Sequence, residues 1–132
     1  MKSITIDIPA IPENIRMIES FIENARDDYR MDDDIYGNIM ISVTEAVNNA
    51  IRHGSAADPE KNVSLTLSMD DHSIRFIIQD SGQGFDYQQL PDPTLPENID
   101  KPAGRGIFLM KHLADEVSFE NNGSCVKLCF YK

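Results

Sequence analysis

The sequence predicts an α/β (α+β) two-layer sandwich, in which three helices cover one face of a mixed five-stranded sheet. Two observations predict this class. Segments in which apolar and polar residues alternate, as they do in half-buried strands, lie at both ends and in the middle of the chain. Segments with apolar residues at helical spacing lie between them. With 132 residues, the chain is expected to form one domain, residues 1–132, with a substantial core.

The first half of the chain predicts a strand followed by two helices. Ile4, Ile6 and Ile8 alternate with polar residues, which predicts a half-buried strand. Apolar residues at helical spacing predict one helix over residues 11–29 and another over residues 35–54. The acidic run at residues 32–34 offers an N-cap for the second helix. Three consecutive carboxylates do not converge on one face, so this run is not interpreted as a metal site.

The second half predicts four strands and one more helix. Alternation predicts strands over residues 63–69 and 74–80, joined by a hairpin turn at residues 70–72. Residues 86–103 have no clear period and hold four of the seven prolines, which indicates a lid or a disordered loop. A helix then begins near residue 106, and two final strands are expected around residues 117–119 and 126–130.

Composition excludes several classes of function. The net charge of −10 disfavours direct binding to nucleic acid, which needs a basic surface. No run of about 18 apolar residues predicts a membrane span, and the start of the chain resembles a strand rather than a signal peptide, so a cytoplasmic protein is expected. Cys125 and Cys129 lie about 13 Å apart along one strand, too far for a disulfide, and are interpreted as buried thiols.

Three patterns carry candidate chemistry, and each has a plain structural alternative. The first is on the second helix, where Glu45, Asn49 and Arg52 share the side opposite the apolar face. Glu45 and Asn49 are one turn apart, so their side chains can reach a common point. Taken alone, such a pair is more often a solvated polar stripe.

The second pattern ends the strand at residues 74–80. Asp80 continues the alternation of the apolar residues before it, so a carboxylate is expected on the buried face, where it needs a donor or a ligand. Gly82 and Gly84 follow and permit a sharp turn or a close approach of another molecule. A plain turn is the alternative. The third pattern, Gly104 and Gly106 before a helix, favours an anion at the helix N-terminus, although it is weak by itself.

The order of the three patterns resembles the ATP-binding (Bergerat) fold of the GHKL superfamily, which includes gyrase, Hsp90, histidine kinases and MutL. The length and two longer runs, residues 45–54 and 104–110, are most similar to the branch of anti-sigma factor serine/threonine-protein kinases. The resemblance covers nearly the whole chain. The motifs that carry it are, in order, Glu45-x-x-x-Asn49-x-x-Arg52-His53, Asp80-x-Gly82-x-Gly84 and Gly104-x-Gly106.

The resemblance implies a role for each residue of the second helix and of the strand end. Asn49 would ligate a Mg²⁺ ion that bridges the ATP phosphates. Glu45 would be the catalytic carboxylate, a general base on a protein hydroxyl. Arg52 would face the phosphates. Asp80 would accept a hydrogen bond from the adenine amino group.

The glycines would form the rest of the nucleotide site. By resemblance, Gly82 and Gly84 would let the adenine lie against the backbone. Gly104 and Gly106 would let the lid wrap the phosphates. Lys101 and Arg105 are candidate charge partners of the γ-phosphate, with simple exposure as the alternative.

The chain departs from the family pattern in two places. Pro102 and Ala103 stand where related kinases often carry a basic residue. This departure makes phosphoryl transfer a weaker expectation than ATP binding. The three histidines lie outside the context of a phosphoacceptor histidine, which argues against a two-component histidine kinase.

The function implied is an ATP-dependent serine/threonine-protein kinase that acts as an anti-sigma factor. Such proteins hold a sigma factor inactive and phosphorylate an anti-anti-sigma (STAS-domain) partner, and members of the branch often form homodimers. The alternative is an ATP-binding regulatory module that binds its partner without phosphorylating it, although such a module does not need Glu45. A plain ATPase and a ligand-free structural domain explain fewer of the motifs.

Overall fold

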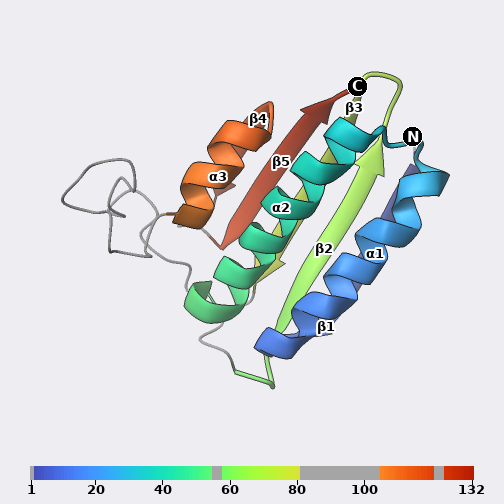
Figure 1. Cartoon of the computed structure of the whole chain (residues 1–132). Coiled ribbons are helices and arrows are strands. Elements are labelled where there is room, and N and C mark those ends of the chain that lie inside the picture. Colours follow the sequence, from blue (N-terminus) through green and yellow to red (C-terminus); the bar gives the residue numbers. More distant parts are fainter. Residues whose placement is uncertain (1, 55–57, 81–104, 121–123) are drawn as a thin grey trace.

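The computed structural model describes residues 2–54, 58–80, 105–120 and 124–132. Its elements, in chain order, are β1 (Lys2–Pro9), the 3₁₀ turn η1 (Pro12–Asn14), α1 (Ile15–Asp28), α2 (Asp33–Asn49), the π turn η2 (Ala50–Gly54), β2 (Asn62–Met69), β3 (Ser73–Asp80), α3 (Arg105–Leu113), β4 (Glu116–Glu120) and β5 (Cys125–Tyr131). The three α-helices cover one face of a single five-stranded sheet (Figure 1). The predicted two-layer fold is therefore confirmed.

The sheet differs from the prediction in one respect, because it is antiparallel throughout and not mixed. The strand order is β1-β2-β3-β5-β4, and each neighbouring pair is antiparallel. Two helices separate β1 from β2 in the chain, so β2 returns against β1. A single helix separates β3 from β4, which leaves these strands pointing the same way, but β5 lies between them.

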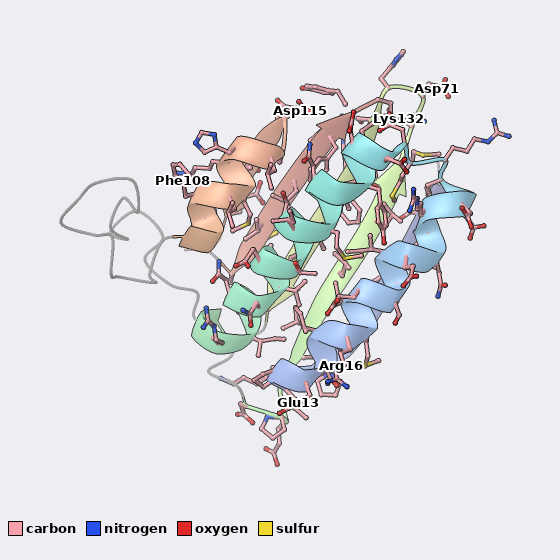
Figure 2. The ribbon with its side chains drawn as sticks, viewed as in Figure 1. Glu13, Arg16, Asp71, Phe108, Asp115 and Lys132 are labelled. Carbon is pink, nitrogen blue, oxygen red and sulfur yellow. The ribbon has the colours of Figure 1, made fainter. Side chains whose placement is uncertain are left out.

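The core lies between the helices and the covered face of the sheet. Figure 2 shows side chains filling the space between the two layers. Phe76 of β3 is fully buried and meets Phe130 of β5 edge to face, with ring centroids 6.1 Å apart. Other completely buried side chains come from both layers, namely Ile18, Ile22, Ile39, Val43, Val47, Leu65, Leu67, Ile74 and Met110.

The start of α2 is set by the acidic run, as predicted. Asp32 is the N-cap, and its side chain accepts a hydrogen bond of 2.9 Å from the backbone N–H of Ile35. Asp33 forms an ion pair with Arg26 of α1, which ties the second helix to the first. Carboxylates in the first turn also suit the positive end of the helix dipole.

The end of α2 differs from the prediction of one regular helix through Gly54. The α-helix ends at Asn49, and residues 50–54 form a π turn. A π turn has a wider hydrogen-bonding ring, so residues beyond Asn49 leave the angular positions that an α-helix would give them. Residues 50–53 contain no Gly or Pro that would have signalled this change, and Gly54 ends the segment.

The turn between β2 and β3 fixes the register that leads to Asp80. One oxygen of the Asp70 carboxylate accepts hydrogen bonds of 2.8 Å from the backbone N–H groups of both His72 and Ser73. The turn sets Met69 opposite Ile74 and, six residues along each strand, Val63 opposite Asp80. Figure 2 places Asp71, in this turn, beside Lys132 at the end of the molecule away from the last turns of α2.

The structure also bears on the predictions for the two cysteines and for membrane-spanning helices. Cys125 and Cys129 are both buried free thiols, as predicted. Burial raises the pKa of each thiol above its ordinary value, which disfavours the reactive thiolate. Among the helices described, none is long and apolar enough to cross a membrane.

The Asp70 turn gives a prediction for the pH dependence of stability. The hydrogen bonds from the His72 and Ser73 N–H groups lower the pKa of the Asp70 carboxyl below its ordinary value of 3.8. A lowered folded-state pKa stabilises the protein above the unfolded-state pKa, and the stabilisation is lost as the pH falls through the folded-state pKa. We expect Asp70→Asn to lower the urea midpoint at pH 7, with the difference from wild type shrinking below about pH 4.

Asp71→Asn is the matched control, since Asp71 is exposed in the same turn and accepts neither of these backbone bonds. A difference between Asp70→Asn and wild type that stays constant from pH 7 to low pH would contradict the assigned role of the Asp70 charge.

Candidate functional site

Three polar residues of α2 are buried or half-buried within the helical layer. Ser42, Glu45 and Asn49 follow one another at intervals of three and four residues, so they share one side of the helix. Ser42 is fully buried, Asn49 is 8% exposed and Glu45 is half-buried. We call these three residues the inner polar stripe. The alternative of a solvated stripe is therefore wrong for Asn49, whereas Glu45 stays partly exposed.

The start of α3 covers this stripe. α2 and α3 pack closely against each other. A Cβ placed on Gly106 would lie 2.6 Å from Glu45 Oε2 and 3.3 Å from Asn49 Nδ2. The first turn of α3 therefore lies beside both side chains, with too little space for a Cβ between them. The structure brings Glu45, Asn49 and Gly106 together, although 57 residues separate Asn49 from Gly106 in the sequence.

Asp80 lies at the same end of the molecule. It is 7% exposed on the covered face of the sheet, as the alternation predicted, and its backbone N–H donates to the carbonyl of Ser124 at 2.9 Å. β3 packs against η2, which directly follows Asn49. In Figure 1 the end of α2, the end of β3 and the start of α3 lie at one end of the two layers.

Arg52 does not join the inner polar stripe. It lies in the π turn η2 and is exposed to solvent, whereas Asn49 one turn earlier is buried. The alignment of Arg52 with Glu45 and Asn49 was predicted from α-helical spacing, and the π turn after Asn49 changes that spacing.

For the remaining predicted site residues, the structure describes no side chain near the site. Gly82, Gly84, Lys101 and Gly104, together with the proposed lid at residues 86–103, lie outside the described residues. Arg105 is the first residue of α3, and only its backbone is described.

Sequence reasoning missed Ser42. Its hydroxyl is buried, and within the part of the chain that the structure describes it has no hydrogen-bond partner. The signal was available, because Ser42 precedes Glu45 by three residues and Asn49 by seven, the spacing of one helix side.

The donors that meet here suit a hard cation and phosphate oxygens. Carboxylate and amide oxygens are ligands that Mg²⁺ accepts, and Mg²⁺ commonly takes only one or two protein ligands beside water and phosphate. Within the described ranges, no three His, Cys, Asp or Glu side chains gather as a metal cluster. The site therefore fits an ion held mainly by phosphate and not an all-protein metal cage. The free N–H groups at the start of α3 favour negative charge.

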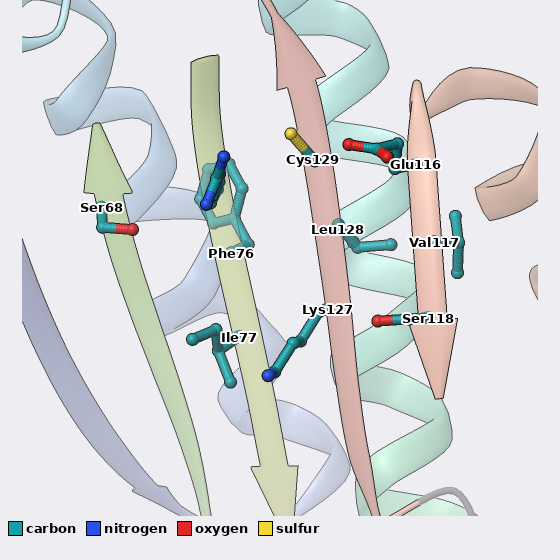
Figure 3. A pocket seen from close by; sticks show the side chains of 10 residues that line it. Ser68, Phe76, Ile77, Glu116, Val117, Ser118, Lys127, Leu128 and Cys129 are labelled. Atoms are coloured by element: carbon teal, nitrogen blue, oxygen red, sulfur yellow. The ribbon is translucent and has the colours of Figure 1, made fainter. Parts of the chain in front are cut away.

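A separate hollow of about 430 Å³ lies on the uncovered face of the sheet (Figure 3). Its rim carries Glu116 and Ser118 of β4 and Lys127 of β5, and Lys127 forms an ion pair of 3.2 Å with Glu120. None of the predicted site residues lines it. The candidate site is therefore the region between α2, α3 and the end of β3.

Comparison with known proteins identifies the family. Residues 8–130 match the family model of the histidine kinase-like ATPase domain. A serine-protein kinase RsbW from Staphylococcus epidermidis is 33% identical over 99 residues, which cover 69% of this chain and 62% of that protein. The RsbW of Bacillus subtilis is 28% identical over 125 residues, covering 90% of this chain and 78% of that protein.

A solved structure shares the fold. The RsbU and RsbW domains of a Mycobacterium tuberculosis protein superpose with a TM-score of 0.68 at 15% identity, over 99% of this chain and 32% of that one. The chain thus spans less than two thirds of the length of the Staphylococcus epidermidis relative and about a third of the solved chain. The family model covers nearly the whole sequence, and the chain therefore belongs to the histidine kinase-like ATPase domain family.

Proposed function

We propose that this protein is an ATP-dependent serine/threonine-protein kinase that acts as an anti-sigma regulatory factor. The observation that carries the proposal is the meeting of the Glu45 carboxylate and the Asn49 amide at the first turn of α3. The names of the relatives as serine-protein kinases support the reaction class. The partners would be a sigma factor and a STAS-domain anti-anti-sigma protein, in the cytoplasm, with the kinase acting as a homodimer.

Glu45 is proposed as the general base. A serine hydroxyl is a weak nucleophile, and a carboxylate within hydrogen-bond reach removes its proton as the phosphoryl group is transferred. The half-buried position of Glu45 limits its access to water, which keeps the carboxylate available for the bound hydroxyl. Asn49 is proposed to hold Mg²⁺ through its side-chain oxygen. When bound, Mg²⁺ neutralises charge on the phosphate oxygens.

Asp80 and the glycines are proposed to select and cradle the nucleotide. Asp80 accepts a hydrogen bond from the adenine amino group, from a buried position that favours a ligand donor over water. Gly82 and Gly84 lie beside the base, while Gly104 and Gly106 lead into the N–H groups that face phosphate. Lys101, Arg105 and the exposed Arg52 are proposed to supply positive charge to the phosphates.

Glu45→Gln tests the proposed reaction. We expect the variant to bind Mg-ATP with nearly wild-type affinity and to lose phosphate transfer by a factor of about 10² to 10⁴, since it keeps the shape of Glu45 but has no basic oxygen. The assay measures transfer of labelled phosphate from Mg-ATP to the STAS-domain proteins of the same organism. Glu23→Gln, an exposed change on α1, is the control.

Transfer by Glu45→Gln at the wild-type rate would remove Glu45 from its role. Tight ATP binding by the wild type without labelling of any STAS protein would favour the regulatory module that does not phosphorylate its partner.

Asn49→Ala tests whether the Asn49 side chain binds Mg²⁺. We expect this variant to bind ATP equally well with and without Mg²⁺, because the alanine has no oxygen for the ion, whereas wild type binds more tightly with Mg²⁺. Titration calorimetry with each form of the nucleotide measures the difference. Asn48→Ala, at the neighbouring half-buried position, is the matched control. Equal affinity with and without Mg²⁺ in the wild type would refute the magnesium role.

Asp80→Asn tests the adenine contact. A hydrogen bond to a charged group contributes about 1.5–3 kcal/mol, so we expect ATP affinity to fall by roughly 10- to 150-fold and the preference for ATP over GTP to narrow. Competition binding with both nucleotides measures this. Asp71→Asn, in the turn at the other end of the molecule, is the control. An unchanged ratio of ATP to GTP affinity in Asp80→Asn would contradict the assignment.

A further inference from the structure

The first turn of α3 lies so close to α2 that a side chain at position 106 would meet Glu45 and Asn49. A Cβ there would lie 2.6 Å from Glu45 Oε2, 3.3 Å from Asn49 Nδ2 and 3.6 Å from Glu45 Cβ. Carbon atoms attract non-bonded neighbours best at about 3.5–4.0 Å, and a contact of 2.6 Å is repulsive. The backbone of Gly106 does not itself require glycine, because its φ is outside the positive range. A side chain at position 106 would instead displace the neighbouring Glu45 carboxylate.

We infer that Gly106 is a positioning residue for Glu45, an inference that rests on the proposed kinase function. Without a Cβ at position 106, the α3 backbone packs directly on the carboxylate and restricts its orientation. The N-terminus of α3 also suits the negative charge of the Glu45 carboxylate, since the first N–H groups of a helix and its dipole favour an anion. Gly106 thus acts on the proposed base, in addition to any contact that its backbone makes with phosphate.

The two roles of Gly106 predict different defects. An alanine keeps the backbone N–H, so phosphate binding through that N–H survives the substitution. The added methyl group displaces the end of the Glu45 side chain, which is flexible enough to rotate away, and moves Asn49 by a few tenths of an ångström. The fold is therefore retained while the orientation of the carboxylate changes.

The kinetic test uses Gly106→Ala with Gly37→Ala as its matched control. Gly37 also lies within a helix, and a Cβ placed on it meets no atom within 4 Å. We expect Gly106→Ala to lower kcat on the order of 100-fold, while the Kd for Mg-ATP changes by only a few-fold. Gly37→Ala should leave both unchanged. A wild-type kcat in Gly106→Ala, or a defect confined to ATP affinity, would overturn the inference.

A double variant tests whether the effect passes through Glu45. Glu45→Asp shortens the side chain by one methylene group, which withdraws the carboxylate from position 106. We expect Gly106→Ala to lower kcat far less in the Glu45→Asp background than in wild type. The effects of the two substitutions on kcat would then be non-additive. If Gly106→Ala alone fails to fold, the double variant should fold, because the contact is relieved. Additive losses, or a double variant that also fails to fold, would overturn the inference.

A third measurement needs no activity. Glu45 can be assigned among the carbon-13 carboxyl resonances of the nucleotide-free protein by the signal that Glu45→Gln removes. We expect Gly106→Ala to shift this signal and Gly37→Ala to leave it in place. If the wild-type protein transferred no phosphate, the proposed function would be contradicted, but the carbon-13 measurement would still test the positioning of Glu45. An unmoved Glu45 signal in folded Gly106→Ala would overturn the positioning role whatever the activity.

Discussion

The contact between the inner polar stripe of α2 and the first turn of α3 is the constraint on which the site depends. Burying polar side chains in a helical layer destabilises the fold unless they form hydrogen bonds or bind a ligand. Here they lie against a glycine, where the backbone of α3 approaches within contact distance of Glu45 and Asn49. The apolar side of α2 packs against the sheet and fixes the helix, so the opposing side presents its polar groups in a defined place.

The sheet supports this contact by bringing distant segments to one end of the molecule. The Asp70 turn sets the β2–β3 register, and that register puts Asp80 on the covered face at the last position of β3. α2 ends at the same end of the sheet, and α3 begins there. The proposed acceptor for adenine, Asp80, and the proposed carboxylate–amide pair of Glu45 and Asn49 are thereby held on packed helices and strands, as precise catalytic geometry requires.

The sequence predicted the elements and their arrangement in two layers, because both follow from short-range periodicity. It predicted Asp80 as buried for the same reason. It did not predict the antiparallel direction of every strand pair, which depends on how two helices reverse the chain before β2. Nor did it predict the π turn that carries Arg52 away, or the burial of Asn49 under α3, since both depend on tertiary packing.

The central claim is that Mg-ATP binds between α2, α3 and the end of β3. A crystal structure with Mg²⁺ and a non-hydrolysable ATP analogue tests it most directly. We expect an ion bound by the Asn49 side-chain oxygen at about 2.0–2.1 Å, with the adenine amino group against Asp80 and the γ-phosphate beside Glu45. A nucleotide bound elsewhere, such as in the hollow on the uncovered face of the sheet, would contradict the account.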